Sequence, residues 1–232
     1  MIDATKKFQC PHCGREFIRE SSFVKHMCKQ KRRWDSRGER HVIMAFEFWK
    51  IWYKRLGMQK QKNTTLEFRN FMESRWYMTF VKVARHVLNT KIINPYQFLD
   101  YLMSNNINVD KWTNETVYHE YIHDINKRES VDVVLERFAK LANTWAHENN
   151  ENWQDYFRNE NVNLIIKNIR NGRISPWILL KSNTAHEFFE RCSEEQTAIV
   201  DEFLNIKVWQ YKMHKNPEDA RFVESALNEL GI

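Results

Sequence analysis

The feature that most constrains this chain is a group of closely spaced metal-ligating residues near its N-terminus. Cys10, Cys13, His26 and Cys28 follow the spacing Cys-x2-Cys-x12-His-x1-Cys, and they include three of the four cysteines in the 232 residues. A tetrahedral metal site needs four nitrogen or sulfur ligands on a short scaffold, and two intervening residues suit a tight turn between the first pair. We therefore expect these four residues to hold one structural Zn²⁺.

Aromatic residues surround the ligands at the positions where a very small module needs its core: Phe8, Phe17 and Phe23. The combined pattern resembles the C2H2 zinc-finger family, which has a second histidine about four residues after the one matched by His26. This chain has Gln30 there, so Cys28 is the expected replacement. The resemblance implies a ββα finger over residues 1–28. His26 and Cys28 are too close to share a face of a regular helix, so we expect the helix to end or tighten at His26.

The Cys-Pro-His-Cys segment also has a redox interpretation, because this tetrapeptide occurs in some thioredoxin-like oxidants. That chemistry needs a low-pKa cysteine at a helix start within a βαβ unit. The few residues before Cys10 cannot supply such a unit, and no strand-rich pattern follows. Within the two-residue turn, His12 is expected to point away from the metal. The pattern favours a metal site over a redox pair.

The net charge of +6 is concentrated at the N-terminal end. Residues 1–40 contain eleven Lys/Arg and five Asp/Glu, whereas residues 41–232 contain 25 of each. An asymmetry of this kind indicates a polyanion-binding end. The finger resemblance implies base contacts from Arg19, Ser22 and Lys25, and we expect phosphate contacts from Lys29, Lys31, Arg32 and Arg33.

The expected partner is nucleic acid, with DNA ahead of RNA. A single finger reads only about three base pairs, so the affinity should be mainly electrostatic and should fall steeply with salt. Trp34 has two interpretations, stacking on an unpaired base or docking the basic segment onto the rest of the chain. The alternative for the whole region is a protein-interaction adaptor in which zinc only folds the N-terminus.

The rest of the chain has helical periodicity and matching capping signals. A basic neck over residues 29–40, either a linker or a helix, should lead to an all-α multi-helix domain over 41–232. Helices are expected over 41–56, ending at Gly57, and from Thr64 to about residue 89. Further helix starts are predicted by Asn94-Pro95, Ser175-Pro176, Thr184-x-x-Glu187, Ser193-x-x-Gln196 and Asn216-Pro217, and Gly172 is a predicted stop. The predicted fold class is mainly α.

His119-Glu120-Tyr121-Ile122-His123 matches the zinc-protease pattern H-E-x-x-H. Against it, Asp124 follows the second histidine, no third ligand appears at the expected spacing, and no sheet scaffold is predicted. A packing stripe explains the segment, so we do not expect an enzyme. A zinc hydrolase using His119, Glu120 and His123 stays as the second alternative function.

Two other features allow two interpretations. Arg173 beside Trp177 is able to form a pocket, although a helix stop and a capped restart explain this turn equally well. The aromatic cluster at 46–53 covers more than one helix face, which predicts either core burial or a partner groove.

Composition completes the functional expectation. The chain is 42% hydrophobic and lacks a run of about twenty apolar residues, so a core is expected and a membrane span is not. Cys192 has no candidate disulfide partner outside the cluster, which indicates the cytoplasm, or that of a host cell. We expect a phage or bacterial accessory protein, a regulator of transcription or replication. Its helical domain should dock a partner protein.

Overall fold

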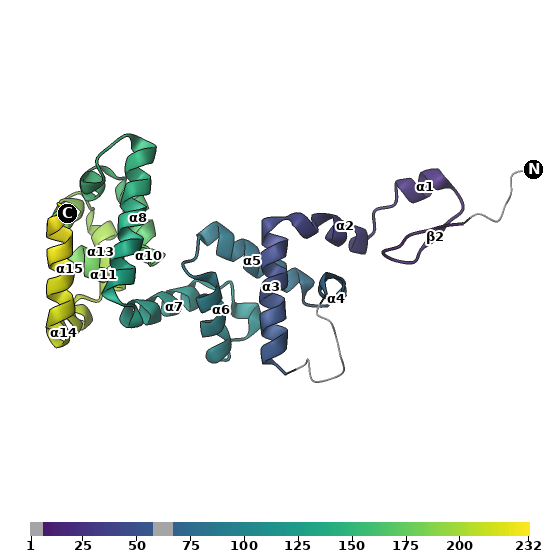
Figure 1. Cartoon of the computed structure of the whole chain (residues 1–232), viewed down its shortest axis with the longest axis horizontal. Helices are drawn as coiled ribbons and strands as arrows, with labels where there is room; N and C mark the ends of the chain where they lie inside the picture. Colours follow the sequence, from purple (N-terminus) through teal and green to yellow (C-terminus); the bar gives the residue numbers. More distant parts are fainter. Residues whose placement is uncertain (1–6, 58–66) are drawn as a thin grey trace, which may run out of the picture. The chain divides into compact units, whose positions relative to one another are not determined.

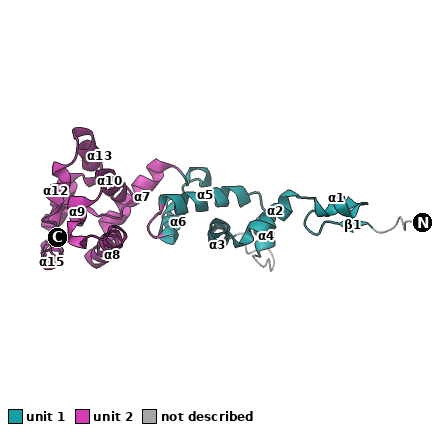
Figure 2. Ribbon diagram, turned by 90° about the horizontal axis from the view of Figure 1, so that it is seen from above, with its two compact units in different colours: residues 1–90, 95–113 teal, residues 91–94, 114–232 magenta. Residues whose placement is uncertain are grey.

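The computed structural model describes residues 7–57 and 67–232, which form mainly helices (Figure 1). The mainly α prediction is therefore confirmed. The chain divides into two compact units (Figure 2). Unit 1 comprises residues 1–90 and 95–113, and unit 2 comprises residues 91–94 and 114–232. This division lies within residues 41–232, which the helical periodicity predicts to be a single domain.

The N-terminal part of unit 1 contains two short strands and a short helix. Strands β1 (Phe8–Gln9) and β2 (Glu16–Phe17) pair antiparallel, with Phe8 opposite Phe17. Helix α1 (Glu20–Val24) follows and carries Phe23. The Phe23 ring lies 5.9 Å from the ring of Phe8 and 6.1 Å from that of Phe17. The three predicted aromatic residues thus form one small cluster.

The basic segment after the ligands is helical. It forms α2 (Lys29–Asp35) and a 3-10 turn (Ser36–Gly38). Helix α2 is separate from α1, because Cys28 has extended backbone and begins a new helix. Helix α3 (Arg40–Arg55) follows, and Gly57 has a φ of 66° just beyond its end, the left-handed conformation expected of a glycine stop.

The single helix expected to end near residue 89 is wrong, because the described part forms two helices. These are α4 (Phe68–Glu73) and α5 (Tyr77–Thr90), and the backbone at Ser74 between them is extended. The break brings the Trp76 ring within 5.1 Å of the Trp52 ring. Aromatic packing of this kind outweighs the modest intrinsic preference for an unbroken helix. Thr64, the expected cap, lies outside the described residues.

The core of unit 1 lies mainly between α3 and α5. Phe48, Trp49 and Trp52 of α3 are buried, which is the burial expected of the 46–53 aromatic cluster. The Trp52 ring lies 5.4 Å from the ring of Phe80 on α5, and the ring of buried Trp112 lies 5.7 Å from Phe80 on another side. The remaining described elements of the unit are α6 (Pro95–Ser104) and a 3-10 turn (Val109–Lys111).

Unit 2 surrounds a second apolar core, in which Phe138 and Phe157 stack at 5.4 Å and Tyr156 is fully buried. Its described helices are α7 (Glu115–Arg128), α8 (Val131–Asn149), α9 (Tyr156–Asn159), α10 (Val162–Arg170), α11 (Pro176–Lys181), α12 (Ala185–Glu190), α13 (Glu194–Leu204), α14 (Ile206–Lys215) and α15 (Pro217–Glu229), with a 3-10 turn at Trp153–Asp155.

The predicted helix starts are correct, but not all of their caps are. Ser175 caps α11, and Ser193 with Gln196 forms the expected capping box on α13. Thr184 and Asn216 make no side-chain cap. The Ser182 hydroxyl accepts from the backbone N–H groups at the start of α12, so it takes the role expected of Thr184.

Gly172 has a φ of 71° and stops α10 as predicted. Within residues 7–57 and 67–232, no helix combines the length and the apolar character that crossing a membrane requires.

Candidate metal centre and its basic surroundings

The four predicted ligands converge in the structure. One sulfur or nitrogen atom from each of Cys10, Cys13, His26 and Cys28 lies within 4.8 Å of all the others. The Cys10 and Cys28 Sγ atoms are 4.0 Å apart, and Cys13 Sγ is 3.2 Å from His26 Nε2. A tetrahedral ion with metal–sulfur distances of about 2.3 Å separates its sulfur ligands by about 3.8 Å. Three sulfurs and one imidazole at these separations form a metal-binding arrangement that is consistent with zinc.

The local fold explains why these side chains meet. Cys10 and Cys13 lie in the turn after β1, which is closed by backbone hydrogen bonds from Cys10 N–H to Arg15 and from Gly14 N–H to Cys10. Helix α1 ends at Val24, before His26. The chain is then free to bring Cys28 back to the cluster, where it also serves as the N-cap of α2. Its sulfur accepts from the Lys31 N–H at 3.3 Å.

The surroundings of the thiols favour their charged forms only in part. Burial raises the pKa of Cys10, but backbone N–H groups of His12 and Cys13 lower it, and the net pKa is below its ordinary value. The Arg15 N–H lowers the pKa of Cys13, but burial and the other thiols raise it, and the net pKa is above its ordinary value. Several thiolates crowded together repel one another, so a bound cation would stabilise all of them.

His12 does not belong to the cluster. Its ring lies 6.0 Å from that of Trp34, so it points away from the ligands as expected. The same contact, together with the Phe68 ring 6.1 Å from Trp34, favours the docking interpretation of Trp34.

The predicted base-contacting residues surround α1. Ser22 lies within the helix, whereas Arg19 precedes it and Lys25 follows it, because α1 is shorter than the expected 20–26 span. All three are exposed. None of their side chains makes an ion pair with another described residue.

The basic residues of α2 divide into two kinds. Lys29 and Arg32 are exposed, and Lys31 is half-buried beside Cys28. Arg33 requires a correction, because it is buried instead of available to a phosphate. Its guanidinium donates to the Met72 carbonyl and lies 4.2 Å from the centre of the Tyr77 ring. The break after α4 leaves that carbonyl without its helical donor, and Arg33 supplies a replacement.

The H-E-x-x-H histidines pack against an aromatic ring. On α7, His119 and His123 lie 4.8 Å and 5.9 Å from the Phe203 ring centre, and Glu120 is exposed. Burial lowers the pKa of both imidazoles. Among the described residues, the group of three or more potential ligands close enough for a metal is the one at Cys10. The contacts of the two histidines with the Phe203 ring are those expected of a packing stripe.

One property of residues 7–28 was not predicted from the sequence: three of their apolar side chains are exposed. Ile18 is 85% exposed, Val24 67% and Met27 52%. The three lie among the ligands and the basic residues in the sequence, and the charge of the segment gives no indication of them. Comparison with family models, with curated proteins and with solved structures gave no match.

Proposed function

We propose that residues 7–28 form a zinc finger and that unit 1 uses it to bind nucleic acid. Cys10, Cys13, His26 and Cys28 would hold Zn²⁺, an ion that suits three sulfurs and one nitrogen whose atoms all lie within 4.8 Å of one another. The ion would have a structural role: it would fix the turn after β1 against the start of α2. A module with so small an aromatic core gains most of its folding free energy from such an ion.

The observation that carries the proposal is the division of charge between the two units. Counted over the sequence, unit 1 contains 21 Lys/Arg and 10 Asp/Glu, a balance of +11. Unit 2 contains 15 Lys/Arg and 20 Asp/Glu, a balance of −5. Attraction to a polyanion would act on unit 1 and repulsion on unit 2. The metal cluster therefore lies in the unit with the charge suited to nucleic acid.

Four exposed side chains are the proposed contacts. Arg19 flanks α1 and would make the base contact, since a guanidinium can pair with two acceptors of guanine. Lys25, Lys29 and Arg32 would bind phosphates, with no competing ion pair to another described residue. The acidic unit 2 would be left to contact a partner protein, in keeping with an accessory role in transcription or replication.

A salt series with the full zinc-loaded chain tests the proposal. Binding to labelled duplex DNA and to RNA is measured by fluorescence anisotropy. Three phosphate contacts predict a slope of about −2.7 in a plot of log K against log salt concentration. The quadruple variant Arg19→Ala, Lys25→Ala, Lys29→Ala, Arg32→Ala should lose most of the affinity and flatten the slope. Lys207→Ala, an exposed lysine of unit 2, is the matched control and should change neither. Binding that is absent, insensitive to salt or unchanged in the quadruple variant would sink the proposal.

A second candidate function, a protein-interaction adaptor, is favoured by the exposed Ile18, Val24 and Met27. Exposed apolar groups on so small a module suit an apolar partner surface. The variant Ile18→Ser, Val24→Ser separates the two functions, because both side chains are exposed and their replacement should leave the fold intact. Unchanged DNA binding by this variant would support the nucleic-acid function. Lost capture of a native partner, with DNA binding absent in the parent chain, would support the adaptor.

A further inference from the structure

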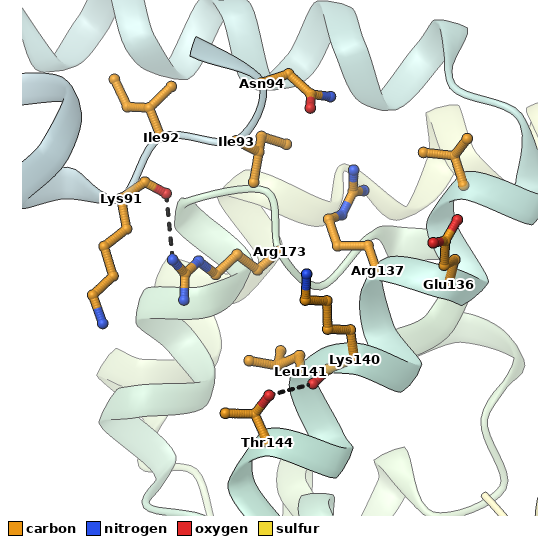
Figure 3. A pocket seen from close by; sticks show the side chains of 11 residues that line it. Lys91, Ile92, Ile93, Asn94, Glu136, Arg137, Lys140, Leu141, Thr144 and Arg173 are labelled. Atoms are coloured by element: carbon orange, nitrogen blue, oxygen red, sulfur yellow. Dashed lines mark hydrogen bonds between the residues drawn. The ribbon is translucent and has the colours of Figure 1, made fainter. Parts of the chain in front are cut away.

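Unit 2 contains a cavity of about 530 Å³ that is remote in sequence from the metal cluster. It lies between the loop at residues 91–94 and one face of α8 (Figure 3). Its volume falls in the range of roughly 300–1,000 Å³ found for sites that bind small molecules. Arg173 also lines it, whereas Trp177 is buried in the core, so only the first half of the pair suggested by the sequence belongs to a pocket.

Helix α8 supplies most of one wall because it has two different faces. Val134, Phe138 and Ala142 pack into the core of unit 2. Arg137, Lys140, Leu141 and Thr144 recur at helical spacing on another face and line the cavity. In Figure 3, Arg137 and Lys140 extend from α8 toward the loop that carries Ile93 and Asn94.

Of the cations at the cavity, Lys140 and Arg173 have positive charge that the protein itself does not neutralise. Arg137 is paired with Glu129 through two hydrogen bonds, and both side chains are largely buried. Lys140 has no ion-pair partner among the described residues. Arg173 is held there by a single long hydrogen bond, 3.4 Å from its Nη2 to the Lys91 carbonyl. A guanidinium has five N–H donors, so most of those on Arg173 are available to a ligand.

Apolar surface lies beside these cations. Ile93 and Leu141 line the cavity and are half-buried, and Ile92 behind them is buried. The loop that carries the two isoleucines is strained at both ends, with φ values of 52° at Lys91 and 48° at Asn94. The Tyr121 hydroxyl holds it by donating to the Ile93 carbonyl at 3.2 Å. Strained backbone that persists in this way is concentrated at ligand sites.

The charge of the rest of the unit narrows the class of ligand. Glu129 neutralises Arg137, so the charges left at the cavity are those of Lys91, Lys140 and Arg173 against a single acidic lining residue, Glu136. Unit 2 as a whole has a balance of −5. A long polyanion would meet the acidic surroundings along most of its length. A small anion would meet only the local positive charge.

We propose that this cavity binds a small organic anion with one apolar portion. Its phosphate or carboxylate group lies between Lys140 and Arg173, and its apolar portion lies against Ile93 and Leu141. The Thr144 hydroxyl oxygen, whose proton is donated to the Lys140 carbonyl at 2.7 Å, remains able to accept a further hydrogen bond. This site is independent of the metal cluster and of nucleic-acid binding.

Calorimetric titration of the full chain with 1-naphthyl phosphate tests the site. One molecule is expected to bind per chain. Lys140→Ala and Arg173→Ala should each weaken binding about tenfold or more, because each removes a charged hydrogen-bond donor. Thr144→Trp fills the cavity without changing its charge and should abolish binding. 1-Naphthaleneacetic acid replaces the phosphate by a carboxylate, and the tighter of the two ligands identifies the preferred group.

The controls decide whether charge and apolar contact both matter. Inorganic phosphate and uncharged 1-naphthol should each bind at least tenfold more weakly than 1-naphthyl phosphate. Lys207→Ala should bind like the parent chain, and thermal unfolding checks that every variant is folded. The proposal is wrong if no 1-naphthyl phosphate binds, if Lys140→Ala and Arg173→Ala bind normally, or if inorganic phosphate binds as tightly. An equal loss of DNA affinity in those two variants would also overturn it, because the cations would then belong to a nucleic-acid surface.

Discussion

The two units of this protein contain similar numbers of apolar residues but differ in their packing and in their charge. Unit 2 packs its helices around a continuous core and has a charge balance of −5. Unit 1 has a balance of +11, and its first segment has only three phenylalanines and a group of ligands to hold it. Repulsion between like charges and a minimal core both lower the folding stability of this segment. A bound metal ion or polyanion would therefore stabilise it. The proposed binding of nucleic acid assigns the excess positive charge of unit 1 a function that unit 2 does not share.

The largest expected effect comes from the metal ligands. Cys10→Ser, Cys13→Ser should reduce the zinc content from one ion per chain to none and unfold residues 7–28. Structural zinc sites contribute about 10–16 kcal/mol of binding free energy, far more than three aromatic rings can replace. Metal analysis and amide exchange measure the two changes, and Cys192→Ser in unit 2 is the control. Retained zinc in the double variant would show that the ion binds elsewhere.

The next effect separates two adjacent arginines of unit 1. Arg33→Ala should lower the free energy of unfolding of unit 1 by about 3 kcal/mol, because it leaves the Met72 carbonyl without its donor. Arg32→Ala should leave stability unchanged and reduce the salt slope of DNA binding by about 0.9. Denaturant unfolding and anisotropy distinguish them. If both variants behaved alike, the division between a structural and a binding arginine would be wrong.

A matched change in unit 2 should affect stability alone. Gly172→Ala places a Cβ atom 2.7 Å from Ile122 Cδ1 at a residue whose φ is 71°. Strained backbone and overpacking together should cost about 2 kcal/mol in the unfolding of unit 2. DNA affinity should not change, since unit 2 is outside the proposed interface. Gly38→Ala has open space around its Cβ and is the control. Normal stability of Gly172→Ala would contradict the packing described at this turn.

The smallest effect is a pH dependence confined to unit 2. Burial lowers the pKa of His119 and of His123, and the charges of Arg170 and Lys127 lower them further. The unfolded chain therefore takes up protons below pH 6.5 before the folded unit does. Stability from these residues is present above pH 6.5 and is lost as the pH falls through the folded pKa values.

Unfolding midpoints of unit 2 at about pH 5 and about pH 7.5 measure this effect. His119→Gln, His123→Gln should show a smaller difference between the two values than the parent chain. The exposed His147→Gln should show the same difference as the parent. A double variant with an unchanged difference would mean that other groups cause the pH dependence.

Local patterns predicted local structure well. The ligand spacing, the aromatic residues around it and the Ser175 and Ser193 caps each depend on residues a few positions apart, and all have the expected geometry. At the start of α12 the Thr184 side chain makes no cap, and the Ser182 hydroxyl accepts from the backbone N–H groups instead.

Features that depend on long-range packing were not predictable from these patterns. Arg33 looks like its neighbours in the sequence, and only the break between α4 and α5 gives it a buried acceptor. The charge is the clearest case, because residues 41–232 balance to zero. That zero combines an excess of five positive charges in the later part of unit 1 with an excess of five negative charges in unit 2. No pattern in the sequence predicts that residues 91–94 belong to unit 2 while the residues on either side of them belong to unit 1.

The most direct test of the central claim is amide hydrogen exchange of the zinc-loaded chain with and without DNA, at the salt concentration where binding is tight. The division of function predicts protection over residues 15–32 of unit 1 and none over unit 2. Protection over unit 2, or DNA binding that leaves residues 15–32 unprotected, would contradict it.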